Sequence, residues 1–224
     1  MRLLAGVCAV LALGTGWVSA GRLAGRIVIL EKDNKPSPDL GDAVVYLEGP
    51  GGAADRAPPA TVEVAITDKV YAPHVLVVPI GSTVRFPNHD PFKHNVFSVS
   101  EPNQFDLGLY ARGEAKSQTF TQPGLVRVYC NVHPRMVAYI HVMANRHYAQ
   151  PGSDGAFLID SVPPGRYRLH VWHERIPSEV VKEVTVGSRG DVQQIALNAR
   201  GYRWQPHRNK YGKNYPTNAG RERY

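Results

Sequence analysis

The chain has 224 residues, which is enough for one large domain or two small ones. Hydrophobic residues make up 43% and charged residues 20%, a balance that excludes disorder over the whole length. Most of the net charge of +7 belongs to the C-terminal end: residues 21–199 carry 18 basic and 18 acidic residues, whereas residues 200–224 carry seven basic residues and one acidic residue, Glu222, and Arg2 supplies the remaining charge.

The first twenty residues have the organisation of a cleavable signal peptide. Arg2 gives a positive start, Leu3 to Leu13 form an apolar run too short to span a bilayer, and Val18-Ser19-Ala20 offers small residues for cleavage. We therefore expect export to a bacterial periplasm and no transmembrane segment. Cleavage after Ala20 would leave Cys130 as the one cysteine, so no internal disulfide is expected.

Short apolar runs bounded by Gly, Pro, Asn or Asp recur along the chain and predict β-strands separated by turns. No stretch between residues 21 and 199 has a convincing helical period. The expected strands are 27–30, 44–47, 62–66, 75–78, 83–86, 96–99, 125–129, 137–142, 157–159, 167–172 and 180–186. The predicted fold class is all-β, with two β-sandwiches.

Two stretches rich in small and polar residues, 49–59 and 145–154, have the composition of linkers. Residues 61–146 are enough for a small sandwich, whereas the flanks 21–48 and 150–199 are each too short to bury a core alone. We expect the two flanks to form one discontinuous domain that the middle domain interrupts.

Residues 200–224 mix basic and aromatic side chains with almost no aliphatic ones, which predicts a flexible tail. Such a mixture can bind nucleic acid. In an exported protein we expect no nucleic acid but an acidic partner or an anionic envelope surface. The alternative is a solvated tail without a dedicated partner.

Residues 130–136 read Cys-Asn-Val-His-Pro-Arg-Met and place a thiol, an imidazole and a thioether within seven positions. With His94 upstream, the donors Cys130, His133 and Met136 form the set of a type 1 copper site, a trigonal His2Cys plane with a weak axial thioether. Mixed nitrogen and sulfur donors hold Cu(I) and Cu(II) with little rearrangement. The pattern predicts one mononuclear copper; the alternative is a buried structural cysteine.

The region from about Thr61 to Met143 resembles the cupredoxins, the plastocyanin, amicyanin and pseudoazurin family of small blue copper proteins. The resemblance rests on His94-Asn95-Val96, on Tyr129-Cys130, and on a Cys-x2-His-x2-Met spacing that matches the short ligand loop of amicyanins. It implies a Greek-key β-sandwich that carries electrons.

The resemblance also implies roles for single residues. His94, Cys130 and His133 would be equatorial ligands and Met136 the axial ligand, while Asn95 would tie the His94 loop to the Cys130 loop. His133 would present the edge exposed to redox partners. Val132 stands where plastocyanins and amicyanins have proline, so its N–H is available to the copper-bound sulfur, and the Asn95 N–H would be a second donor.

The flanks resemble a second family, the carboxypeptidase regulatory-like, transthyretin-like β-sandwich. Residues 24–28 and 42–47 look like its first two strands, and residues 154–157 and 162–167 look like later strands with their turn. The whole would be a cupredoxin inserted in, or flanked by, this second sandwich. The family name implies no peptidase activity here.

The remaining histidines predict no second metal site. His89 is a rival copper ligand, and His74 at a strand start is expected to be structural. His170 and His173 are three apart on a strand and face opposite sides, so they do not share a metal. No hydrolase or phosphate-binding motif is present, and no catalytic residues are expected.

We therefore expect an exported copper protein, not an enzyme, that carries single electrons from a donor dehydrogenase or cytochrome to another protein. One alternative is copper handling by a periplasmic chaperone or storage protein. The other is a module that binds a saccharide or envelope component through its sandwich, with copper only structural.

Overall fold

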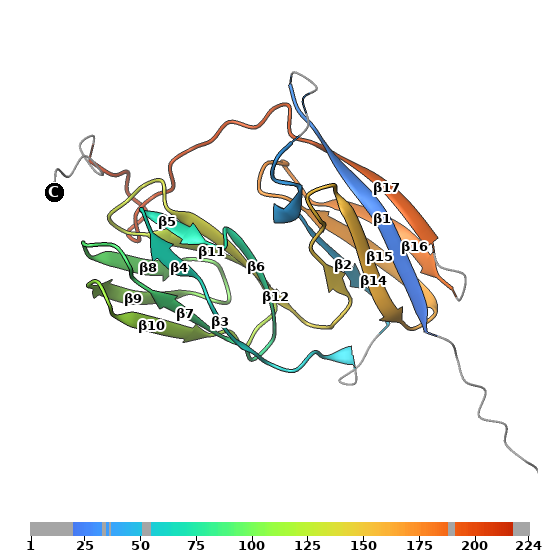
Figure 1. Ribbon diagram of the computed structural model, residues 1–224, viewed down its shortest axis with the longest axis horizontal. Coiled ribbons are helices and arrows are strands. Elements are labelled where there is room, and N and C mark those ends of the chain that lie inside the picture. The colour runs from blue at the N-terminus through green and yellow to red at the C-terminus, as the bar shows by residue number, and fades with distance from the viewer. Residues whose placement is uncertain (1–19, 33–34, 36, 51–54, 188–190, 217–224) are drawn as a thin grey trace, which may run out of the picture.

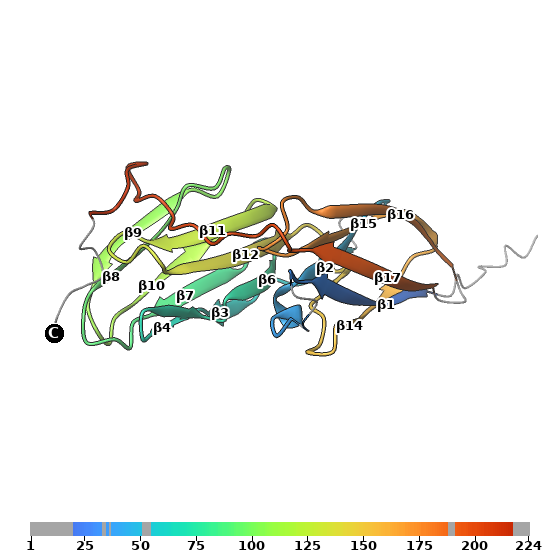
Figure 2. The same ribbon diagram turned by 90° about the horizontal axis from the view of Figure 1, so that it is seen from above.

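The computed structural model describes residues 20–32, 35, 37–50, 55–187 and 191–216. Apart from a 3-10 helix, η1 (Leu40–Asp42), the elements of this part of the chain are strands, so the predicted all-β class is confirmed. Two bodies lie end to end along the long axis (Figures 1 and 2). The predicted signal peptide falls outside the described residues except for Ala20. In the part described, no helix has the length and apolarity needed to cross a membrane.

The inner body is a β-sandwich formed by residues 61–143. One sheet has the strand order β6-β12-β11-β8-β9, another has the order β10-β7-β3, and β4 pairs with β5. Its strands are β3 (Thr61–Glu63), β4 (Ala65–Thr67), β5 (Val70–Ala72), β6 (Val75–Pro79), β7 (Thr83–Pro87), β8 (His94–Ser98), β9 (Phe105–Tyr110), β10 (Ala115–Thr119), β11 (Gly124–Cys130) and β12 (Val137–Met143). The parallel pair of β6 and β12 joins distant parts of the chain.

Alternation along β11 shows how the sequence orients this sheet. Val126, Val128 and Cys130 are buried and Arg127 is exposed, because successive side chains of a strand point to opposite faces. Full burial of a side chain such as Val128 contributes about 1.5–3 kcal/mol. The same alternation that builds the core therefore turns the Cys130 side chain inward.

The outer body combines strands from both flanks of the chain. Its sheets have the orders β14-β1-β17 and β13-β2-β15-β16. Its strands are β1 (Gly21–Leu30), β2 (Val44–Glu48), β13 (Tyr148–Ala149), β14 (Ala156–Val162), β15 (Gly165–Trp172), β16 (Val180–Val186) and β17 (Asp191–Asn198). Leu23, Ile27, Leu47, Leu169 and Leu197 are almost fully buried between these sheets. Each of the two sheets contains strands from both flanks.

A small apolar cluster joins the two bodies. Val44 and Trp172 of the outer body pack with Val75 and Met143 of the inner one. On the same junction, His74 Nε2 lies 2.8 Å from a carboxylate oxygen of Glu174. The structural role expected for His74 is thus an ion pair between the two bodies.

The prediction from the sequence omits several strands that lie at sheet edges. β9, β10, β13 and β17 are edge strands, and none of them is among the predicted runs. On β10 the exposed and half-buried side chains alternate without one buried residue, so this strand has no apolar signal. The expected run 62–66 is divided at Val64, whose N–H donates to the Arg85 carbonyl between β3 and β4.

Candidate metal centre

Three predicted ligands meet at one end of the inner body. His94 begins β8, Cys130 ends β11, and His133 lies in the loop that leads to β12. The Cys130 Sγ atom is 3.6 Å from His94 Nδ1 and 3.5 Å from His133 Nδ1. The donor atoms of all three lie within 4.8 Å of one another. His94 and Cys130 are fully buried and His133 is 4% exposed.

These spacings fit one metal ion at the centre of the three donors. A first-row ion lies about 2.3 Å from a thiolate sulfur and about 2.0 Å from an imidazole nitrogen. At the 120° angle of a trigonal site, those lengths leave about 3.7 Å between sulfur and nitrogen. The two sulfur–nitrogen distances around Cys130 are close to this value. The triad therefore needs little movement to hold a trigonal ion.

Asp90 fixes the ligating nitrogen of His94. Its Oδ2 atom lies 2.7 Å from His94 Nε2, so a neutral ring keeps its proton on Nε2 and directs the Nδ1 lone pair at the metal position. Burial lowers the pKa of His94, so the ring is neutral at neutral pH. Burial opposes ionisation of Asp90, but the N–H groups of Lys69 and Asp68 and the His94 ring outweigh it and lower the Asp90 pKa. Sequence reasoning assigned Asp90 no role.

Backbone N–H groups surround the Cys130 sulfur. Burial raises the pKa of the Cys130 thiol, and hydrogen bonds from the N–H groups of Asn95, Val132 and His133 partly offset this increase. Two of these donors, on Asn95 and Val132, were expected from the sequence. A coordinated thiol loses its proton, so these N–H groups then stabilise the thiolate.

We predict that Val132→Pro lowers the reduction potential of the copper-loaded protein. The substitution removes an N–H that withdraws electron density from the thiolate and so favours Cu(I). A neutral hydrogen bond contributes about 0.5–1.5 kcal/mol, which limits the shift to about 60 mV for one electron. Voltammetry of the variant and the wild type measures it. An equal or higher potential with an unchanged spectrum would contradict the role of this N–H.

Met136 lies in the same short loop as two of the ligands. Its N–H donates to the His133 carbonyl at 3.1 Å, which folds the loop into a turn. Its side chain is 1% exposed and packs in the core cluster that contains Cys130. A thioether in this position suits the weak axial interaction of a type 1 site.

One expectation about the site needs correction. His133 does not present an exposed edge, because its ring packs against Phe92 and His94, with centroids 5.6 and 4.7 Å away. The expected link between Asn95 and the Cys130 loop is present through the Asn95 backbone N–H, while the Asn95 side chain donates to Asp106 Oδ1 on β9 at 2.6 Å. The rival ligand His89 is exposed and lies outside the triad.

The sequence predicted a flexible tail, and where the structure describes the C-terminal segment it contacts the inner body. We call residues 202–216 the C-terminal strap, because this segment contacts residues 130–136, the ligand loop. Tyr215 Oη donates to the Cys130 carbonyl at 2.8 Å, and His207 Nε2 lies 3.3 Å from the His133 carbonyl. Aromatic rings and backbone carbonyls of the inner body give the strap partners that it could not supply itself.

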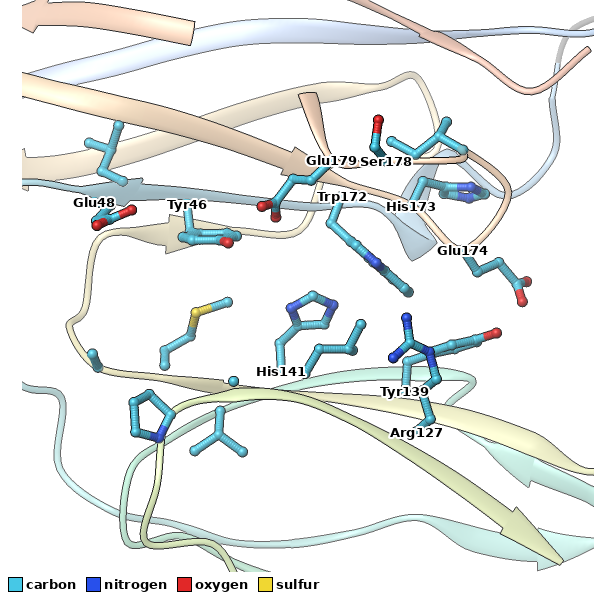
Figure 3. Close-up of a pocket in the computed structure, with 18 of the residues that line it drawn as sticks. Tyr46, Glu48, Arg127, Tyr139, His141, Trp172, His173, Glu174, Ser178 and Glu179 are labelled. Atoms are coloured by element: carbon cyan, nitrogen blue, oxygen red, sulfur yellow. The ribbon is translucent and has the colours of Figure 1, made fainter. Parts of the chain in front are cut away.

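A cleft of about 570 Å³ lies between the two bodies (Figure 3). Tyr139, His141 and Trp172 line it, with Glu174 and Glu179 on the side of the outer body. Burial lowers the pKa of His141 to about 3, and Arg127 adds to this effect. None of the lining residues belongs to the donor triad, so this cleft is separate from the metal centre.

Comparison with known proteins finds a family match over the inner body. Residues 59–143 match the copper binding proteins of the plastocyanin/azurin family. The chain is similar to a purple cupredoxin from Nitrosopumilus maritimus, at 24% identity over 38% of this chain and 99% of that one, with a TM-score of 0.33. It is also similar to a reduced mutant of amicyanin, at 30% identity over 46% of this chain and 99% of that one, with a TM-score of 0.35.

A third similar structure is the copper-containing nitrite reductase from Thermus scotoductus SA-01. The identity is 27% over 52% of this chain and 28% of the reductase, with a TM-score of 0.35. No curated protein matches the chain significantly. The family match and the donor triad together identify the cofactor as one mononuclear copper ion, as the sequence predicted.

Proposed function

We propose that this chain carries single electrons through a type 1 copper centre, which the match of residues 59–143 to the plastocyanin/azurin family of copper-binding proteins supports. His94, Cys130 and His133 would hold the copper in the trigonal plane, and Met136 would be the axial ligand. The observation that carries the proposal is the buried His2Cys triad with sulfur–nitrogen distances of 3.5 and 3.6 Å. Bound copper would supply a Cu(I)/Cu(II) couple.

The enclosure of the triad supports electron transfer over bond chemistry. Its donor residues are at most 4% exposed, so a substrate in solution has almost no contact with them. An electron needs no such contact, since it can tunnel through the surrounding protein. A ligand set fixed by Asp90 and by N–H groups also limits rearrangement between the two oxidation states. No catalysed reaction is part of this proposal.

The same burial argues against copper delivery or storage. A protein that passes copper to another chain needs donors that the recipient can reach. Here His94 and Cys130 are fully enclosed, and Met136 is 1% exposed. We therefore favour electron transfer over copper handling as the function of this chain.

The setting of this function is a further part of the proposal. Arg2, the apolar run after it and Val18-Ser19-Ala20 support export to the periplasm. Donors and acceptors there would be redox proteins such as a dehydrogenase or a cytochrome. We also propose that the outer body is a transthyretin-like sandwich, which its two packed sheets support.

Redox cycling of the copper-loaded protein tests the function. We expect an intense visible absorption with Cu(II), complete bleaching by ascorbate and full recovery on reoxidation, with the copper retained over several cycles. Retention is measured by metal analysis after desalting at each step. Transfer of the copper to a Cu(I) chelator at each reduction would favour copper handling instead. A copper that ascorbate does not reduce would contradict electron transfer.

A further inference from the structure

The C-terminal strap returns from the outer body to the copper end of the molecule. In Figures 1 and 2 the red segment after β17 crosses to the inner body and reaches the end where β8 and β11 lie. Three hydrogen bonds join the strap to the ligand loop. Tyr215 and His207 bond to the carbonyls of Cys130 and His133, and the Lys210 N–H donates to Asn131 Oδ1 at 3.0 Å.

Aromatic packing seats the strap beside a copper ligand. The His207 ring stacks on Tyr129, the neighbour of Cys130, with centroids 4.4 Å apart and an interplanar angle of 21°. Phe97 and Tyr215 meet the same ring edge-on at 6.2 and 5.3 Å. Burial lowers the pKa of His207, so this ring packs as a neutral group. The strap therefore has a defined place against the loop.

An ion pair links the strap to the His94 side of the centre. Lys210 Nζ lies 2.6 Å from Asp106 Oδ2, and the other oxygen of Asp106 accepts a hydrogen bond from the Asn95 side chain. Asn95 follows the ligand His94 and directs its own N–H at the Cys130 sulfur. Both ligand-bearing segments are thus in contact with the strap.

The outer surface of the strap is basic and aromatic. Arg203, Arg208 and Lys213 are exposed, and the strap contains no acidic residue. Trp204 is 43% and Tyr211 71% exposed, although both are large and apolar. Arg135 of the ligand loop adds a further exposed cation, 5.2 Å from the Trp204 ring. Arg, Trp and Tyr are the residue types that dominate binding energy in protein interfaces.

We propose that the C-terminal strap is the surface on which an acidic redox partner protein docks. This inference rests on the proposed electron-transfer function. Since the His133 side chain is enclosed, a partner cannot meet the copper ligands directly. It can meet the strap, which is one hydrogen bond away from Cys130 through Tyr215 and one from His133 through His207. Positive charge at this end steers an acidic partner to the copper and not to the outer body.

The experiment compares electron exchange with two forms of one cytochrome. Native cytochrome c is basic, and its succinylated form is acidic because lysines carry added carboxylates. In each exchange the ferrous haem gives one electron and the copper passes from Cu(II) to Cu(I), with no proton or bond transferred. Stopped-flow rates at rising ionic strength are recorded for the full-length copper-loaded chain.

The test variant removes three strap charges, R203Q/R208Q/K213Q. Its matched control, R22Q/R166Q/K182Q, removes the same charge from exposed residues of the outer body. We expect the acidic cytochrome to react faster than the native one with the wild type. At low salt the strap variant should lose about tenfold in rate with the acidic cytochrome. The control variant should stay within about twofold, and the strap effect should vanish as salt screens the charges.

The outcomes distinguish failure of the docking surface from failure of the proposed electron-transfer function. Equal rates for the strap variant and the control variant would overturn the docking surface while leaving electron transfer intact. If the strap variant keeps its rates but no longer sediments with phosphatidylglycerol vesicles, the strap binds an anionic membrane and the inference is wrong. A copper that neither cytochrome nor ascorbate reduces would overturn both proposals. Voltammetry of each variant checks that the potential is unchanged.

Discussion

Copper-loaded Cys130→Ser should lack the intense visible absorption of the wild type. That absorption arises from charge transfer between a thiolate and Cu(II), and Cys130 is the one cysteine among the described residues. A serine hydroxyl is a hard, weakly ionised donor that does not replace a soft thiolate. The visible spectrum of equal amounts of Cu(II)-loaded variant and wild type measures the change, and we expect complete loss of the band.

Met136→Leu is the matched control for this result. It removes the other sulfur of the ligand loop but keeps a buried apolar side chain of similar volume. Because the axial thioether is a weak ligand, the band should remain and the potential should rise. A Cys130→Ser protein that stays blue would refute the ligand assignment. A colourless Met136→Leu protein would show that the thioether is more than a weak axial donor.

Asp90→Ala should weaken copper binding by about 10- to 100-fold, which is the usual cost of losing a partner that orients a ligand. Without the carboxylate 2.7 Å from Nε2, the His94 ring can place its proton on Nδ1, where the metal needs a lone pair. Competition with a colorimetric Cu(I) chelator measures the affinity.

Asp90→Asn separates this effect from a general loss of structure. An amide oxygen can still accept the Nε2 proton, so its affinity should fall less than that of the alanine variant. Asp90 also accepts the N–H groups of Asp68 and Lys69, so urea unfolding of each metal-free variant is the accompanying control. A copper affinity of Asp90→Ala within about twofold of the wild-type value would show that Asp90 does not orient His94 for the metal.

The sequence determined the core strands and the copper chemistry, because both depend on local patterns. β11 follows from apolar alternation, which turns Cys130 inward, and β12 follows from an almost continuous apolar run. The ligand loop needs seven residues to supply three donors, so residue type and spacing were enough to predict the triad with His94.

Tertiary structure alone decided what surrounds that triad. The edge strand β10 carries only exposed and half-buried side chains, and it becomes a strand because β7 offers it a free edge. Asp90 becomes the partner of His94 only when the loop before β8 folds back. The strap binds carbonyls of Cys130 and His133, and every residue has a carbonyl, so no side-chain pattern could mark these positions. A charged, aromatic tail thus became part of the copper end through backbone groups that a sequence does not distinguish.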